Sequence, residues 1–417
     1  MKRMLLKAPK SLPRELAGGA VDIPRASGLF VTMPVHQRRT GGSLRRKLHA
    51  KIRHGGRILA LLTALCGTGA FAQTEADFAV RLTADGQGVV ILKYTGTAAQ
   101  VRIPALIQGM PVREIGSGEW RDPVVGPEVT GVVIPAGVTK INAYAFYQEE
   151  GGSELASVTI PEGVMEIGEY AFYGCASLTA VTLPVGLQTI GERAFSTCPS
   201  LTAIVLPVGL QTIGEGAFAY CSSLAVATLP EGLQIIGGYA FGECTSLTAV
   251  ALPAGLQTIG GRAFENCSSL TAVTLPAGFQ TIGEGAFAYC SSLATVVFSA
   301  SLQSIGGYAF RGCSSLTSIT FPAGLQRIDR DAFASCTSLT AITLPAGLQT
   351  IGEYAFYGCS SLTTVTYPDT IQITGLPQGG AAEAFTDCPR LSPASWAAIK
   401  KLDELAKANR ERAKAKE

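Results

Sequence analysis

The sequence predicts an α/β repeat solenoid, a fold in which short chain segments of equal length coil and stack on one another. The first observation is a unit of 23 residues that recurs from Leu178 to Cys359, as in LTAVTLPVGLQTIGERAFSTCPS at 178–200. The second is a set of apolar residues that keep this spacing, and the third is the glycine and proline at fixed places in each copy. A fixed period of this length is typical of stacked coils.

Three apolar ladders identify the predicted core. Phenylalanines recur every 23 residues from Phe172 to Phe356, isoleucines from Ile167 to Ile351, and leucines from Leu178 to Leu362. A single coil is too small to bury such side chains, so they must pack against their equivalents in neighbouring coils. The sequence therefore predicts a leucine-rich repeat solenoid whose core lies between the repeats.

Each unit is predicted to contain two short strands. Residues 178–183 alternate apolar and small side chains and end at Pro184, which suits a strand that pairs in parallel with the next coil. A glycine then turns the chain, and residues 187–190 form a second extended segment. A short helical turn is expected around Ala194 and Phe195, before the next copy begins.

The charges are distributed unevenly along the chain. The 417 residues carry a net charge of +2, with 47% apolar and 15% charged residues. Residues 1–57 contain 14 of the 33 basic residues but only Glu15 and Asp22 of the 31 acidic ones, so the remainder is acidic. If the front is removed, the mature chain has no general attraction for nucleic acid or anionic membranes.

Residues 47–72 are predicted to be a signal peptide. Basic residues precede the apolar run ILALLTALCGTGAFA, and Ala72 ends a small-x-small cleavage signal before Gln73. The run is too short for a membrane-spanning helix, and Leu65 argues against a lipid anchor at Cys66. An ordinary apolar helix is the alternative. Residues 1–46 are interpreted as a disordered or misassigned leader, and the mature protein as secreted or located at the cell surface, without a transmembrane segment.

The remaining chain divides into three parts. Residues 73–120 are predicted to form an N-terminal cap, with two strands around Asp85-Gly86, and a first irregular coil. Residues 121–391 form the leucine-rich repeat solenoid. Residues 392–417 form a C-terminal capping helix and a charged tail, which is expected to fray beyond Lys407. The apolar stripe of that helix comprises Trp396, Ile399, Leu402 and Leu405.

Nothing in the mature sequence predicts catalysis. His36, His49 and His54 all lie before the expected cleavage site, so histidine-based catalysis and histidine metal sites are excluded from the mature chain. We therefore expect no enzyme activity, no cofactor and no metal. The cysteines that recur from Cys175 to Cys359 share the period of the core, which favours buried free thiols over disulfides or metal binding.

The candidate partner-binding face lies around the Ala-Phe step of each unit, where the repeats differ most. Tyrosine and arginine gather there, and both are enriched among interface hot spots. An alternative is that the tyrosines only cover the turn with their apolar rings. The candidate residues are Tyr170, Tyr173, Arg193, Tyr220, Tyr239, Arg262, Tyr289, Tyr308, Arg311, Tyr354 and Tyr357.

The repeated unit [SC]-S-L-x-x-V-x-L-P-x-G-L-x-x-I-G-x-x-A-F-x-x-C resembles the repeats of BspA-like bacterial leucine-rich repeat surface proteins. The resemblance covers residues 75–391 and rests on many copies of the motif. It implies an exported protein without catalytic residues, and attachment to host matrix proteins or other cells. Ser299, Phe279 and Asp329 depart from the motif and are expected to leave the fold unchanged.

These observations predict an exported, non-enzymatic binding scaffold. Its partner is expected to be a protein of the host matrix or of another cell surface, contacted at many weak sites held at fixed spacing. The competing hypothesis is a structural surface spacer or matrix component without a specific ligand.

Overall fold

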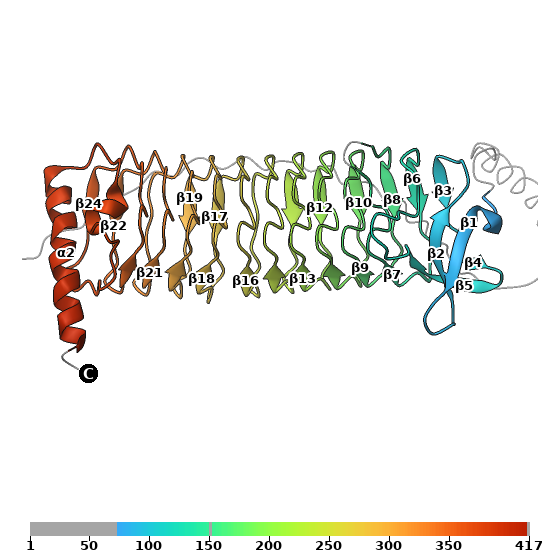
Figure 1. Ribbon diagram of the computed structural model, residues 1–417, viewed down its shortest axis with the longest axis horizontal. Coiled ribbons are helices and arrows are strands. Elements are labelled where there is room, and N and C mark those ends of the chain that lie inside the picture. Colours follow the sequence, from blue (N-terminus) through green and yellow to red (C-terminus); the bar gives the residue numbers. More distant parts are fainter. Residues whose placement is uncertain (1–72, 150–151, 415–417) are drawn as a thin grey trace, which may run out of the picture. The chain divides into compact units, whose positions relative to one another are not determined.

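The computed structural model describes residues 73–149 and 152–414, and it has the predicted solenoid architecture (Figure 1). The predicted leader and signal peptide fall on residues 1–72, outside the described residues. Successive coils stack side by side, and their strands form two rows, upper and lower in Figure 1. Strands in a row pair in parallel at equivalent positions of the repeat, as Ile190 pairs with Ile213. The register is thus one unit of 23 residues per coil.

Each row has its own strand length. The three-residue strands, called here the long-strand row, are β3 (Gln100–Arg102), β6 (Gly131–Val133), β8 (Ser157–Thr159), β10 (Ala180–Thr182), β12 (Ala203–Val205), β14 (Val226–Thr228), β17 (Ala272–Thr274), β19 (Thr295–Val297), β22 (Ala341–Thr343) and β24 (Thr364–Thr366). The two-residue strands, called the short-strand row, are β7 (Lys140–Ile141), β9 (Glu166–Ile167), β11 (Thr189–Ile190), β13 (Thr212–Ile213), β15 (Ile235–Ile236), β16 (Thr258–Ile259), β18 (Thr281–Ile282), β20 (Ser304–Ile305), β21 (Arg327–Ile328) and β23 (Thr350–Ile351).

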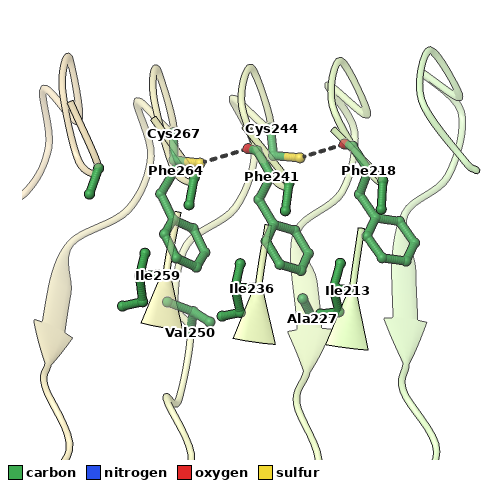
Figure 2. Close-up of a cluster of buried hydrophobic side chains, with 14 of the residues drawn as sticks. Ile213, Phe218, Ala227, Ile236, Phe241, Cys244, Val250, Ile259, Phe264 and Cys267 are labelled. Carbon is green, nitrogen blue, oxygen red and sulfur yellow. Dashed lines mark hydrogen bonds between the residues drawn. The ribbon is translucent and has the colours of Figure 1, made fainter. Parts of the chain in front are cut away.

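The core is a stack of phenylalanine rings, as the ladders predicted. From Phe146 to Phe385, neighbouring rings have centroids 4.9–5.5 Å apart and planes within 11° of each other. Figure 2 shows three of these rings, each beside the isoleucine of its own coil. All the stacked rings are buried. Since each ring packs on rings of neighbouring coils, no coil is stable by itself.

The cysteines link coils through hydrogen bonds. Each S–H donates to the carbonyl of the phenylalanine in the coil before, as Cys244 does to Phe218 and Cys267 to Phe241, both at 3.2 Å (Figure 2). The ten cysteines among the described residues are free and buried, in agreement with the predicted buried thiols. Burial raises the pKa of Cys175 to about 12, so the thiol keeps the proton that it donates.

The segment expected to be a helical turn is a series of tight turns instead. In the coil from Gly191, the N–H groups of Arg193, Phe195 and Thr197 donate to carbonyls of the next coil at 2.8 Å each. A helix would direct these groups to its own turn. Residues with positive φ at Arg193 and Thr197 break the helical path and allow this third set of bonds between coils.

The N-terminal cap is a β-hairpin, as predicted. β1 (Phe78–Leu82) follows a short 3-10 helix, η1 (Glu75–Asp77), and pairs antiparallel with β2 (Val89–Tyr94). β2 then pairs in parallel with β5 (Met110–Ile115). β5 also pairs antiparallel with β4 (Leu106–Ile107), and it pairs in parallel with β7, the first strand of the short-strand row. The hairpin is joined to the segment that follows it, because the N–H of Tyr94 donates to the carbonyl of Val124 at 2.7 Å and the N–H of Gly116 donates to that of Ile91 at 2.8 Å.

The C-terminal cap is the predicted helix, α2 (Pro393–Lys414), preceded by the 3-10 helix η2 (Ala381–Phe385). Ile399 and Leu402 are buried against the solenoid, while Trp396 and Leu405 are half-buried. The hydroxyl of Ser395 accepts the N–H of Val365 at 3.1 Å, so it satisfies a donor of the last long strand.

The helix does not fray beyond Lys407, contrary to the prediction. Asn409 donates to the carbonyl of Ile373 at 2.9 Å and Arg410 to that of Thr374 at 2.5 Å. These bonds satisfy carbonyls of the chain segment that replaces a regular coil, and they hold the last turns of the helix in place.

Both strand rows are interrupted at one coil boundary, which we call the Phe279 seam. The short-strand row ends at β16 and restarts at β18, and among the described residues β17 has no partner in the coil before it. A cavity of about 490 Å³ lies there, lined in part by Leu256, Ile259 and Phe279. The turns remain joined, since the N–H of Phe264 donates to Ala286 at 2.9 Å.

Phe279 accounts for the break in the short-strand row, because leucine occupies this position in neighbouring coils. The long-strand row is also unpaired between β10 and β12, where the position holds leucine, so its break has another origin. The glycine after the core isoleucine normally stands against the backbone of the previous coil: a Cβ at Gly214 would lie 2.6 Å from Gly191. At Gly283 the nearest atom would be 3.0 Å away. The departure at Phe279 therefore preserves the fold but separates two coils locally.

We predict that Phe279→Leu closes the seam. Removing the larger side chain relieves overpacking, and the bond from the Gly283 N–H to the Ile259 carbonyl can form, so the free energy of unfolding should rise by about 1 kcal/mol. Hydrogen exchange of residues 281–283 should slow. The matched variant Leu302→Phe should create the same break one coil later and speed exchange there. Unchanged exchange in both variants would disprove the role of this side chain.

Candidate functional site

The turn face is the surface formed by the turns between each short strand and the following cysteine, equivalent to residues 191–198. All eleven predicted site residues lie on it, and each is exposed or half-buried. Each regular coil has two residues with positive φ here, and glycine occupies several of these places. Other positions with positive φ hold a predicted site residue, with φ between 49° and 61°. These residues are Tyr170, Arg193, Tyr220, Tyr239, Arg262, Tyr289, Tyr308 and Tyr354.

Positive φ is unfavourable for tyrosine and arginine by about 1–2 kcal/mol per residue. The coil-to-coil bonds of the turns hold this conformation, as in Tyr170, whose N–H donates to Glu192 at 2.8 Å. Glycine would relieve the strain at each place, so the side chains are present despite a cost in stability. The turn face is therefore a rigid support that displays large polar aromatic side chains.

The N-terminal part of the turn face is an aromatic cluster. Tyr144 stacks on Tyr170 with centroids 5.2 Å apart, and Tyr147 stacks on Tyr173 at 5.3 Å. Trp120 contacts Tyr144 edge-on at 5.3 Å, and 64% of its surface is exposed. Burial and hydrogen bonding to a glutamate raise the pKa of Tyr144 to about 12, so its hydroxyl stays neutral.

Sequence analysis missed three members of this cluster, Trp120, Tyr144 and Tyr147. Insertions on either side shift this coil out of the 23-residue period. A local signal was present, because Tyr144-Ala-Phe-Tyr147 repeats Tyr170-Ala-Phe-Tyr173. Trp120 had no such signal, since it lies in an irregular segment.

A groove adjoins the aromatic cluster. It has a volume of about 560 Å³ and is lined by Tyr173, Arg193, Ser196, Thr197, Ala219, Tyr220 and Tyr239. The guanidinium of Arg193 donates to the hydroxyl of Tyr170 at 2.9 Å and lies 5.7 Å from the centre of that ring. Across the groove, the hydroxyls of Tyr220 and Tyr239 lie 3.4 Å apart, within hydrogen-bond distance. Burial raises the pKa of Tyr239, so its hydroxyl is uncharged.

The central part of the turn face contains Arg262, Tyr289, Tyr308 and Arg311. Arg262 forms an ion pair with Glu265 at 4.0 Å. Arg311 lies 5.6 Å from the centre of the Tyr308 ring. Tyr289 is 45% exposed, and like the others it belongs to coils beyond the groove. These residues form a second group along the same face.

The C-terminal part is an ion-pair network around Asp331, which sequence analysis also missed. Its carboxylate forms ion pairs with Arg311 and Arg330 at 3.1 Å each, and Arg330 also forms an ion pair with Glu353 at 3.1 Å. Arg330 lies 5.8 Å from the centre of the Tyr354 ring. Tyr354 and Tyr357 meet edge-on at 5.9 Å. Basic and acidic groups are balanced here, so no net charge is presented.

In the ranges 73–149 and 152–414, no group of three or more His, Cys, Asp or Glu side chains is arranged to hold a metal ion. Every buried side-chain nitrogen and oxygen described has a hydrogen-bond partner. Among these residues, no helix combines the length and apolar character needed to cross a bilayer.

Comparison with solved structures finds similarity to leucine-rich repeat proteins from three bacteria. A leucine-rich repeat protein from Bacteroides ovatus is 27% identical, over 76% of this chain and 92% of that one, with a TM-score of 0.53. A leucine-rich cell surface protein from Faecalibacterium prausnitzii is 29% identical over 71% and 94%, with a TM-score of 0.44. The T. pallidum leucine-rich repeat protein is 30% identical over 58% and 90%, with a TM-score of 0.36.

The family comparison covers most of the solenoid. No curated protein sequence matches the chain. The model of the BspA type leucine-rich repeat region matches in six copies, over residues 126–227, 216–340 and 257–392. These segments together cover more than half of the chain and coincide with the coils described above. The chain therefore belongs to the BspA-type leucine-rich repeat family.

Proposed function

We propose that this protein is an exported scaffold of the cell surface that binds a protein of the host matrix or of another cell through its turn face. The observation that carries the proposal is the contrast between surfaces. The turn face displays tyrosine and arginine on a hydrogen-bonded backbone, whereas the long-strand row presents small side chains such as Ala180 and Thr182. Tyrosine and arginine supply most of the binding energy in many interfaces.

Family membership and charge support the proposal. The BspA-type family is one of repeat scaffolds, and the relative from Faecalibacterium prausnitzii is described as a cell surface protein. After residue 57, acidic residues outnumber basic ones, which disfavours binding to nucleic acid. Contacts repeated along the solenoid would add up, because the coils hold them at fixed spacing.

A structural spacer without a specific ligand is the second candidate. The near-identical repeats and the small residues of the long-strand row favour it. The two functions differ in whether wild-type protein binds one matrix protein saturably.

We predict that replacing tyrosines of the turn face weakens partner binding. The variant Tyr308→Ser, Tyr354→Ser, Tyr357→Ser should bind its matrix partner about tenfold more weakly or worse, because aromatic contacts are removed. Binding to immobilised collagen, laminin and fibronectin measures this. Thermal unfolding should change little.

The matched control changes the long-strand row: Thr182→Ser, Thr228→Ser, Thr274→Ser should bind like wild type. Equal affinity of the tyrosine variant and wild type would refute the turn face as the binding surface. Absence of saturable wild-type binding to every matrix protein would favour the spacer.

We also predict that the protein recovered from its native cells begins at Gln73. Cleavage after Ala72 would remove the basic front, as for a secreted precursor. N-terminal sequencing of cytosolic, membrane and released fractions measures this. An intact front on protein confined to the cytosol would contradict export.

A further inference from the structure

We propose that the groove between Tyr173, Arg193, Thr197, Tyr220 and Tyr239 is a binding site for a neutral sugar chain, with one pyranose ring over each coil. The inference rests on the proposed function in that it takes the turn face as the binding face. It goes further because it assigns one site on that face to a carbohydrate.

The lining of the groove provides the two kinds of contact that a sugar requires. The rings of Tyr173, Tyr220 and Tyr239 offer apolar faces against which the C–H groups of a pyranose can pack. Thr197 and Arg193 lie in the same lining and can exchange hydrogen bonds with hydroxyl groups. Tyr220 is 51% exposed, so its ring is accessible from solvent.

The charges around the groove favour an uncharged ligand. Arg193 lies in the lining and would repel a cation, including one attracted by the aromatic rings. An anion would meet a carboxylate next to Arg193, since Glu192 accepts a hydrogen bond at 3.5 Å from the Tyr170 hydroxyl that Arg193 contacts. Glu243, which accepts a hydrogen bond from Tyr239 at 3.4 Å, adds a further negative charge at one end. A hydroxyl-rich neutral ligand avoids both repulsions.

The spacing of the coils distinguishes a sugar chain from an extended peptide. Beside the groove, the core rings Phe195, Phe218 and Phe241 repeat at 5.5 and 5.4 Å, and Tyr220 and Tyr239 lie 5.7 Å apart. One pyranose ring of an extended β-linked chain has nearly this length. A peptide strand presents side chains on one face about every 6.6 Å, which falls out of step with the coils.

The chain contains its own control for this site. The turn EGAFAYCSS occurs at 215–223 and again at 284–292, so Tyr220 and Tyr289 have the same local sequence and nearly the same φ, 61° and 59°. Their surroundings differ: where the groove has Ser196, the equivalent position 69 residues later is Glu265. Likewise Arg311 replaces Gly242, which adds a second charged side chain beside Tyr289. The two tyrosines thus lie in the same kind of turn, but only Tyr220 lines the groove.

The test is a calorimetric titration of residues 73–417 with cellohexaose, a neutral β-linked sugar. Wild type should bind it saturably, and Tyr220→Ala should weaken binding about tenfold or more. Tyr220→Phe should retain most of the affinity, because the ring remains. Tyr289→Ala should bind like wild type. No binding by wild type, or equal loss in Tyr220→Ala and Tyr289→Ala, would overturn the proposal.

A second arm separates this site from the proposed function. Capture of a matrix glycoprotein by the immobilised protein is measured before and after enzymatic removal of the glycans. The measurement is repeated with cellohexaose as competitor. Loss of capture by either treatment identifies the partner's glycan as the ligand source. Capture that survives both, yet weakens in Tyr220→Ala, would mean a peptide ligand and would overturn the sugar site while the proposed function stands. Cellohexaose binding without capture of any matrix protein would support a free polysaccharide and contradict the proposed function.

Discussion

The packing of each coil on the next is the constraint on which the whole molecule depends. Phenylalanine rings such as Phe218 and Phe241 are buried only because neighbouring coils cover them. This spacing of about 5 Å also explains the glycine after the core isoleucine, at Gly214 for example, where a Cβ would collide with the previous coil. It places each buried thiol within hydrogen-bond distance of a carbonyl in the coil before. Side chains of the core have accordingly little freedom to vary.

The same stacking makes the turn face the part of the repeat that can vary. Bonds between the turns hold each backbone in place, so Tyr220 or Arg193 can occupy a position where glycine would be less strained. Side chains on neighbouring coils are then presented at fixed intervals. Different side chains can therefore be grouped along one face, and the groove beside Tyr220 and the ion-pair network at Asp331 illustrate how different two regions of that face can be.

The regular part of the fold could be predicted from sequence because one period governs the core, as in the ladder from Phe172 to Phe356. The seam could not, because it depends on how far the larger Phe279 pushes two coils apart. The candidate residues lie together on the turn face, as their shared place in the repeat predicted, but their grouping depends on neighbours: the groove is open where small residues such as Ala219 lie between the tyrosines. The extension of the C-terminal helix arises from bonds to distant carbonyls, which periodicity does not reveal.

The most direct test of this account is the thermal unfolding of two deletion variants, followed by circular dichroism. One removes a whole unit, residues 247–269, and the other removes only residues 258–260, which leaves one coil three residues short. If the core lies between equivalent positions of successive coils, the first deletion should preserve the spectrum and one cooperative transition at a somewhat lower temperature. The second should unfold at a much lower temperature, because a coil that is three residues short cannot place both its leucine and its phenylalanine against those of its neighbours. Equal damage by the two deletions would contradict the account.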